Sequence, residues 1–95
     1  MIDHFFHPNG VAIIGATDNP AKGGYHILRN TLAGYKGRVY PVNPRYEEIQ
    51  GTRCYPNVES IPEDFDLAIY FIPAKFLPDT IKACAKKGVK AIIIE

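Results

Sequence analysis

The sequence predicts a single α/β domain with a doubly wound parallel sheet, and three observations indicate this fold class. Four short apolar runs are rich in β-branched and aromatic residues and mostly continuous, which is typical of strands buried on both faces. Segments with helical periodicity separate the first run from the second and the third from the fourth. The 95 residues carry no internal repeat and no linker, so we expect one domain spanning residues 1–95.

Each apolar run is a predicted strand, which gives strands at residues 11–14, 39–42, 67–72 and 91–94. The first predicted helix spans residues 25–33, because Leu28 and Leu32 share one helical face and a glycine follows. The second predicted helix spans residues 76–87, with Pro78 in its first turn and lysines near its C-terminal end. Both helices therefore lie between consecutive strands.

The proline-containing segment 43–66 does not fit this alternation. We expect short helical pieces at residues 46–49 and 58–61, and a short edge strand at residues 52–55. Right-handed crossovers then predict the order edge strand, second strand, first strand, third strand and last strand, with the two helices on opposite faces. Ligands bind such sheets where the strand order reverses, so the loops after Ile14 and Ile72 should flank a binding site.

Composition excludes several classes of protein. Hydrophobic residues make up 46% and charged residues 22% of the chain, which excludes intrinsic disorder. A net charge of +1 argues against nucleic-acid binding, and no apolar stretch approaches the roughly 18 residues that span a membrane. The N-terminus lacks the features of a signal peptide, so we expect a soluble, cytoplasmic protein. Cys54 and Cys84 lack metal-ligand spacing and are expected to be reduced thiols, so no metal site is predicted.

A glycine-containing loop joins the first predicted strand to the first predicted helix. Glycine lets a ligand approach the backbone closely, and the N–H groups of a helix N-terminus bind anions. The loop differs from the dinucleotide fingerprint G-x-G-x-x-G because Thr17 replaces the second glycine, and it is not a Walker A motif. It is a candidate pyrophosphate-binding loop, and its candidate ligand contacts are Gly15, Ala16, Thr17, Asp18, Asn19, Pro20, Lys22 and Gly23.

Two other predicted strands end in candidate ligand contacts. Asn43 follows the second strand where an NAD-dependent dehydrogenase would place an acidic residue, and Arg45 lies close by. Because a guanidinium binds phosphate bidentately, Arg45 suits a phosphorylated ribose such as that of NADP or coenzyme A (CoA). After the third strand, Ile72-Pro73-Ala74 offers a small, stiff edge on which an adenine or a pantetheine arm could lie.

No catalytic residue is predicted. The sequence contains no recognisable Ser/His/Asp set, no close pair of carboxylates in a plausible cleft, and no nucleophile with an obvious base. The histidines His4, His7 and His26 are expected to be surface residues. The candidate site is therefore predicted to bind a ligand without catalysing a reaction.

Four segments together resemble one known family, and they cover nearly the whole chain in order: residues 6–17, 37–46, 51–56 and 66–76. They closely resemble the N-terminal CoA-binding domain of NDP-forming acyl-CoA synthetases, relatives of the succinyl-CoA ligase alpha subunit. The resemblance implies a Rossmann-like, three-layer α/β/α domain. It also implies that residues 15–20, Arg45 and the Ile72-Pro73-Ala74 turn contact CoA or acyl-CoA.

The resemblance also implies what the whole protein does. Members of this family interconvert acyl-CoA, ADP and phosphate with free acid, ATP and CoA. This chain resembles only the CoA-binding module, so it should bind CoA without catalysis and partner the downstream ligase domains of a longer protein. Two departures matter: the family often has lysine where Arg45 stands, and its CoA contacts beyond the fourth strand would follow Glu95. The family's phosphorylated histidine lies in later domains, so none of the three histidines inherits that role.

Two alternatives remain open at this point. A stand-alone CoA-binding protein shares the Val42-Asn43-Pro44 pattern and the pattern of residues 51–56. An NADP-dependent oxidoreductase domain is disfavoured by Thr17 and by the lack of catalytic residues. Because the chain stops on the apolar strand 91–94, we expect it to be the N-terminal part of a longer protein and, in isolation, to self-associate through this strand.

Overall fold

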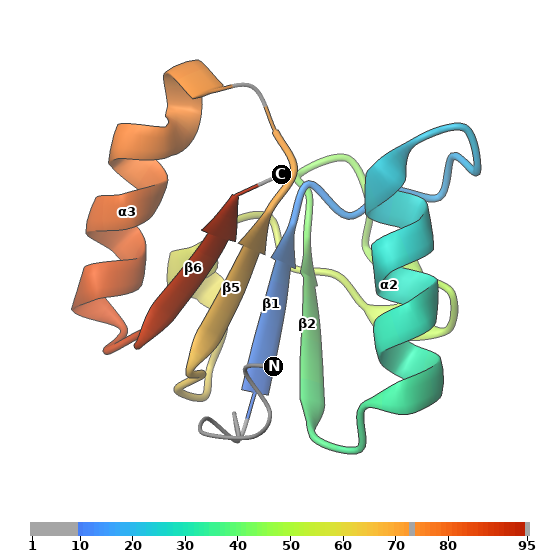
Figure 1. Cartoon of the computed structure of the whole chain (residues 1–95), viewed down its shortest axis with the longest axis horizontal. Helices are drawn as coiled ribbons and strands as arrows, with labels where there is room; N and C mark the ends of the chain where they lie inside the picture. The colour runs from blue at the N-terminus through green and yellow to red at the C-terminus, as the bar shows by residue number, and fades with distance from the viewer. Residues whose placement is uncertain (1–9, 73, 95) are drawn as a thin grey trace.

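The computed structural model describes residues 10–72 and 74–94 (Figure 1). His4, His7 and the candidate contact Pro73 lie outside the described residues. The elements follow one another as β1 (Gly10–Ile14), α2 (Gly23–Gly34), β2 (Arg38–Val42), β3 (Glu48–Ile49), β4 (Thr52–Arg53), η1 (Val58–Ser60), β5 (Leu67–Tyr70), η2 (Ala74–Phe76), α3 (Leu77–Lys86) and β6 (Ala91–Ile94). No helix among these residues is long and apolar enough to cross a bilayer.

The main sheet has four parallel strands in the order β2-β1-β5-β6, which confirms the predicted order of the four principal strands. β1 is central, and its last residue, Ile14, pairs with Val42 of β2 and Tyr70 of β5. The third predicted strand is two residues too long, because β5 ends at Tyr70. The strand order reverses between β1 and β5, as predicted.

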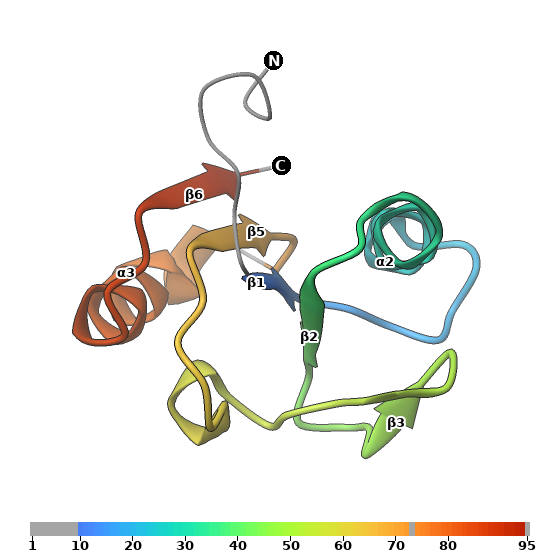
Figure 2. The same ribbon diagram turned by 90° about the horizontal axis from the view of Figure 1, so that it is seen from below.

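Alternate residues of β1 pack into two separate clusters. Val11 and Ile13 pack with Leu28 of α2, whereas Ala12 and Ile14 pack in the cluster that contains Ala83 and Cys84 of α3. Since successive strand residues point to opposite faces, the two helices must cover opposite faces of the sheet. Figure 2 shows α2 and α3 on the two sides of the strands. The doubly wound, three-layer architecture is confirmed.

The segment between β2 and β5 differs from the prediction in two places. The prediction of a helical piece at residues 46–49 is wrong, because Glu48–Ile49 is a strand that pairs with Thr52–Arg53 in a separate antiparallel hairpin. The hairpin turns at Gln50 and Gly51, whose φ angles are 52° and 77°, as a two-residue turn between strands requires.

The edge strand expected at residues 52–55 is only partly present. Tyr55 alone forms a parallel bridge with Val42, through hydrogen bonds from Tyr55 N to Pro41 O and from Asn43 N to Tyr55 O, both 2.9 Å. The residues before it pair with β3 instead. The helical piece expected at 58–61 is confirmed as the 3-10 turn η1, which the side chain of Asn57 caps by accepting a hydrogen bond from Ser60 N.

Candidate functional site

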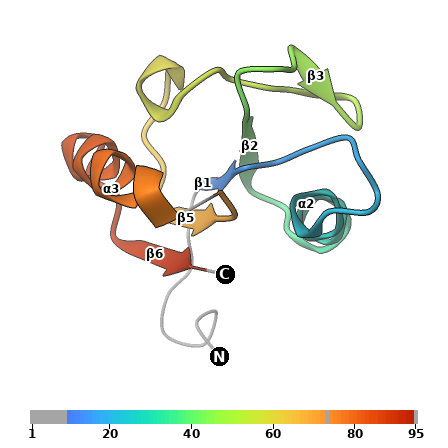
Figure 3. The same cartoon turned by 90° about the horizontal axis from the view of Figure 1, so that it is seen from above.

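A cleft lies where β1, β2 and β5 end, and it comprises two adjoining cavities. Figure 3 views the molecule from this end, with α2 and α3 on either side of the sheet. The first, which we call the loop cavity, has a volume of about 730 Å³. Its lining residues come from the β1–α2 loop, the β2–β3 loop and the chain after β5: Gly15, Thr17, Asn19, Lys22, Gly23, Gly24, Asn43, Pro44, Arg45, Tyr46, Phe71, Ile72 and Phe76.

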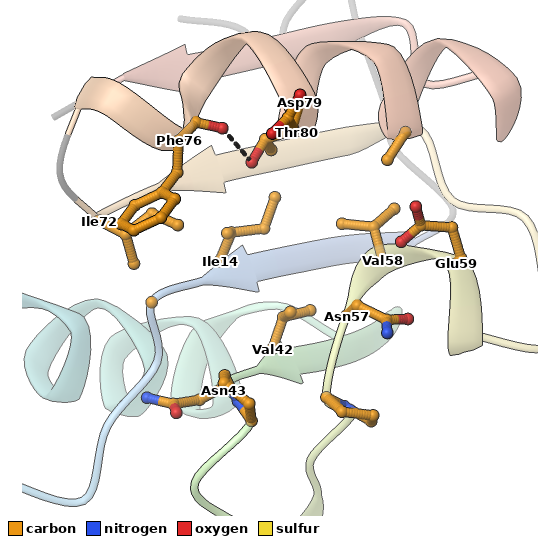
Figure 4. A pocket seen from close by; sticks show the side chains of 14 residues that line it. Ile14, Val42, Asn43, Asn57, Val58, Glu59, Ile72, Phe76, Asp79 and Thr80 are labelled. Atoms are coloured by element: carbon orange, nitrogen blue, oxygen red, sulfur yellow. Dashed lines mark hydrogen bonds between the residues drawn. The ribbon is translucent and has the colours of Figure 1, made fainter.

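The second, which we call the apolar cavity, has a volume of about 310 Å³ and lies on the α3 side of the sheet (Figure 4). Aliphatic side chains from β1, β2, η1 and the chain after β5 form much of its wall. Its lining residues are Ile14, Gly15, Val42, Asn43, Pro44, Pro56, Asn57, Val58, Glu59, Ile72, Phe76, Asp79, Thr80 and Ala83. The sequence did not predict this cavity.

The glycine at the end of β1 allows the loop to turn tightly against β5. Gly15 has φ of 96°, a conformation that other residues rarely adopt. A Cβ atom there would lie 2.7 Å from Ile72 Cγ2 and 3.0 Å from the backbone carbon of Phe71. Gly24 packs equally closely, because a Cβ on it would collide with the carbonyl oxygen of Gly15. These contacts bring the N-terminus of α2 against the end of β1.

Polar contacts within the described residues hold the loop in place. Asn43 Nδ2 donates a 2.8 Å hydrogen bond to Ala16 O, and Ala21 N donates one of 2.9 Å to Asn19 Oδ1. The hydroxyls of Thr17 and Tyr46, 3.2 Å apart, join the loop to the β2–β3 loop. Asn43 thus fixes the shape of the site through its side chain.

The loop cavity favours an anion. The N-cap residue of α2, Lys22, makes no capping hydrogen bond through its side chain, and the first turn of this helix contains no acidic residue. The positive end of the helix dipole therefore faces the cavity together with Lys22 and Arg45. Arg45 is exposed, and its backbone N–H donates a 2.9 Å hydrogen bond to Asn43 Oδ1.

Most of the candidate contacts meet in this cleft. The cavities are lined by eight of the candidates that the sequence pointed to: Gly15, Thr17, Asn19, Lys22, Gly23, Asn43, Arg45 and Ile72. Ala16 is buried and offers only its carbonyl to Asn43, while Asp18 and Pro20 are exposed and line neither cavity. Ala74 begins η2.

Sequence reasoning did not single out every lining residue as a candidate contact. In the loop cavity those not singled out include Tyr46, Phe71 and Phe76. In the apolar cavity the missed residues include those of η1 and α3. These two elements lie far apart in the sequence, and only their packing brings the residues together. The one sequence signal was Asn57 three residues before Ser60, a helix-capping spacing that predicts a turn but not a pocket wall.

The described residues hold no cluster of three or more His, Cys, Asp or Glu side chains suited to a metal ion. His26, expected at the surface, is exposed, and its ring Nε2–H donates a 2.7 Å hydrogen bond to Pro20 O. Both cysteines are buried free thiols, and burial raises the pKa of each. Neither thiol lines the cleft.

Comparison with known families identifies the domain. The model of the family described as the CoA binding domain matches residues 9–95. The chain belongs to this family. Its Rossmann-like fold is thus that of a CoA-binding domain.

Two similar proteins are longer enzymes. The alpha subunit of the ADP-forming acetate–CoA ligase II of Pyrococcus furiosus is 47% identical over 94 residues, which are 99% of this chain and 21% of the relative. A structure of the Ca. Korarchaeum cryptofilum dinucleotide forming acetyl-coenzyme A synthetase 1, in complex with phosphate and ADP, superposes with a TM-score of 0.88. It is 40% identical and aligns with 97% of this chain and 20% of its own. The CoA-binding domain thus spans about a fifth of each relative.

A smaller protein has the same fold. A conserved hypothetical protein from Pyrococcus furiosus is 36% identical, with a TM-score of 0.82, and the match covers 92% of this chain and 74% of that chain. The CoA-binding domain therefore resembles both a part of large synthetases and most of a small protein.

Proposed function

We propose that this chain binds CoA in the cleft and serves as the CoA-binding module of an ADP-forming acyl-CoA synthetase. The observation that carries the proposal is the meeting of the β1–α2 glycine loop, the uncapped N-terminus of α2 and Arg45 around one cavity. The family match and the relatives named as ADP-forming CoA ligases support it. In such an enzyme CoA is a substrate that is acylated and released.

The charges of the loop cavity suggest where each phosphate of CoA binds. The pyrophosphate would lie against the turn at Gly15 and Thr17, where the N–H groups of the α2 N-terminus and Lys22 offset its charge. The 3′-phosphate of the ribose would bind the Arg45 guanidinium, which suits a bidentate phosphate contact. Asn43 would hold both loops in this arrangement through its hydrogen bonds to Ala16 O and Arg45 N.

The whole enzyme would interconvert acyl-CoA, ADP and phosphate with acid, ATP and CoA. The part of the chain described here would contribute binding and orientation of CoA, and downstream domains would contribute the phosphoryl-transfer chemistry. The downstream domains would therefore be the partners of the CoA-binding module. We expect the whole enzyme to be cytoplasmic.

Titration calorimetry with CoA, dephospho-CoA, NADP and NAD tests the proposal. We expect CoA to bind about tenfold or more tightly than dephospho-CoA, because one charge-assisted phosphate contact contributes about 1.5–3 kcal/mol. Arg45→Ala should remove most of this difference, whereas Arg29→Ala, which changes an exposed arginine of α2 that does not line the cleft, should keep it. Equal affinity for CoA and dephospho-CoA would exclude Arg45 from the 3′-phosphate site, and tighter binding of NADP would refute the proposal.

A stand-alone CoA-binding protein is the second candidate, and the small Pyrococcus furiosus protein favours it, because this chain covers 74% of that protein. The coding sequence after the Glu95 codon separates the two candidates. A reading frame that continues into further domains supports the synthetase, and a stop codon close behind supports the small protein.

A further inference from the structure

Two hydroxyl groups meet beside the loop cavity, where the β1–α2 loop faces the β2–β3 loop. Thr17 Oγ1 and the hydroxyl oxygen of Tyr46 are 3.2 Å apart, and both residues are half-buried and line the cavity. Asn19 N also donates a hydrogen bond of 3.2 Å to Thr17 Oγ1. The Thr17 hydroxyl therefore has two hydrogen-bonding neighbours within the protein before any ligand binds.

The chemistry of the two hydroxyls determines which one donates. A phenol is a stronger acid than an aliphatic alcohol, so a tyrosine hydroxyl is the better donor and a threonine hydroxyl the better acceptor. Tyr46 accordingly donates to Thr17 Oγ1. A hydroxyl oxygen has two lone pairs and one proton. The N–H of Asn19 occupies one lone pair of Thr17 Oγ1 and the O–H of Tyr46 occupies the other, so the Thr17 hydroxyl can act toward a ligand only as a donor.

A ligand in the loop cavity can accept the proton of Thr17. The cavity favours an anion, because Lys22, Arg45 and the N-terminus of α2 face it. Ionised phosphate oxygens accept hydrogen bonds, and a hydrogen bond to a charged group is about twice as strong as a neutral one. A hydroxyl whose proton is already directed at the phosphate needs no reorientation when the ligand binds, and such preorganisation increases affinity.

We propose that Tyr46 is a positioning residue for CoA: its hydroxyl donates to Thr17 Oγ1, and this contact directs the proton of Thr17 toward the pyrophosphate. The inference rests on the proposed function, since it takes the pyrophosphate to lie against the turn at Gly15 and Thr17. Thr17 contacts the ligand, and Tyr46 acts through Thr17. Without the hydroxyl of Tyr46, the Thr17 hydroxyl can rotate and present a lone pair to the phosphate, which disfavours binding.

Calorimetry with CoA on three single variants tests the inference. Thr17→Val removes the donor with little change in shape and should weaken binding about tenfold or more, the effect of one hydrogen bond to a charged group. Tyr46→Phe leaves the donor but frees its rotation, so the loss should be smaller, about threefold. Tyr25→Phe makes the same chemical change on α2, at a residue that lines neither cavity, and should leave the affinity unchanged.

Double variants show whether Tyr46 acts through Thr17. In the Thr17→Val background, Tyr46→Phe should cause no further loss of affinity, because the hydroxyl that it orients is gone. In the Thr17→Ser background, Tyr46→Phe should again weaken binding about threefold, since a serine hydroxyl has the same hydrogen-bonding capacity as that of threonine.

Dephospho-CoA separates this role from a displaced loop. Arg45 directly precedes Tyr46, so a shift of the β2–β3 loop in Tyr46→Phe would impair binding of the 3′-phosphate and reduce the preference for CoA over dephospho-CoA. Both ligands contain the pyrophosphate. The proposed role therefore predicts that Tyr46→Phe weakens both about equally and leaves the preference unchanged.

Equal losses of affinity in Thr17→Val and Tyr46→Phe would show that the contact only ties the two loops together, and would overturn the inference. An unchanged affinity for CoA in Tyr46→Phe, a further loss in the Thr17→Val background, or a reduced preference over dephospho-CoA would overturn it as well. If the native chain binds CoA and one of these results is obtained, the inference fails and the proposed function stands. If the native chain does not bind CoA, the proposed function fails and the inference fails with it.

Discussion

Gly15 lies at the point on which the geometry of the cleft depends. Its φ of 96° directs the chain away from β1, and its missing side chain lets Ile72 and Phe71 approach from the end of β5. The sequence marked this glycine as a place where a ligand could approach the backbone closely. It did not show that the protein's own chain after β5 approaches there, because that contact joins residues far apart in the sequence.

Gly15→Ala should lower the free energy of unfolding by about 1–3 kcal/mol, because the new Cβ is strained at this φ and too close to Ile72. Gly34→Ala is the matched control, since a Cβ at the end of α2 has no heavy atom within 4 Å. It should change the stability by less than about 1 kcal/mol, in the stabilising direction if at all. Urea denaturation measures both, and equal effects of the two substitutions would contradict this account of the loop.

The raised pKa of the Cys84 thiol predicts how the free energy of unfolding depends on pH. Burial, and to a smaller extent the Glu59 carboxylate, raise the pKa of this thiol from 9.0 to about 11. Between these values the unfolded chain releases the proton and the native chain retains it, so the free energy of unfolding falls as pH rises. The contribution of Cys84 to this fall is of order 2 kcal/mol.

Urea denaturation of the native chain and of Cys84→Ala across this pH range checks the prediction. The variant should be less stable at neutral pH because the core loses an atom, yet its stability should decline less steeply with pH. Some decline will remain, because burial also raises the pKa of Cys54, Tyr40 and Tyr70. Parallel declines in the two proteins would show that Cys84 titrates normally.

Among the elements, the four main strands were predictable and the β3–β4 hairpin was not. Continuous apolar runs identify strands buried on both faces, and the alternation of strands with helices determines their order. Residues 46–49 have ordinary helix propensity, but Ile49 is 1% exposed and packs in the cluster of Leu28 on the α2 side. Tertiary burial thus outweighed local propensity at this hairpin.

The apolar cavity could not be predicted from the sequence for a related reason. Glu59 belongs to η1 and Asp79 to α3, and nothing in their sequence spacing indicates that they line one space. The packing of α3 against η1 on one face of the sheet creates the cavity. The loop cavity was predictable because its residues follow strand ends, and the ends of parallel strands meet at one edge of a sheet.

Strand β6 is a candidate for contact between copies of the chain. Within the described residues it pairs only with β5, and its last residue, Ile94, is 56% exposed. We predict that the 95-residue chain self-associates through β6, because an unpaired apolar edge strand pairs readily with another chain. Ile94→Lys should weaken the association about tenfold, the loss expected when one isoleucine is no longer buried.

Sedimentation velocity over a series of concentrations measures this association. Ala33→Lys, which adds the same charge at an exposed position of α2, should leave it unchanged. A monomer at every concentration, or equal effects of the two lysines, would show that β6 does not mediate contact between copies.

For the molecule as a whole, the central claim is that CoA binds where β1, β2 and β5 end. Two-dimensional ¹H–¹⁵N NMR of the labelled chain during titration with CoA tests it most directly, since every non-proline amide reports separately. We predict saturable shifts centred on Gly15, Thr17, Lys22 and Arg45, with amides at the opposite edge of the sheet, such as Gly37, Asp64 and Lys90, unchanged. The absence of saturable shifts, or shifts centred on that opposite edge, would contradict the claim.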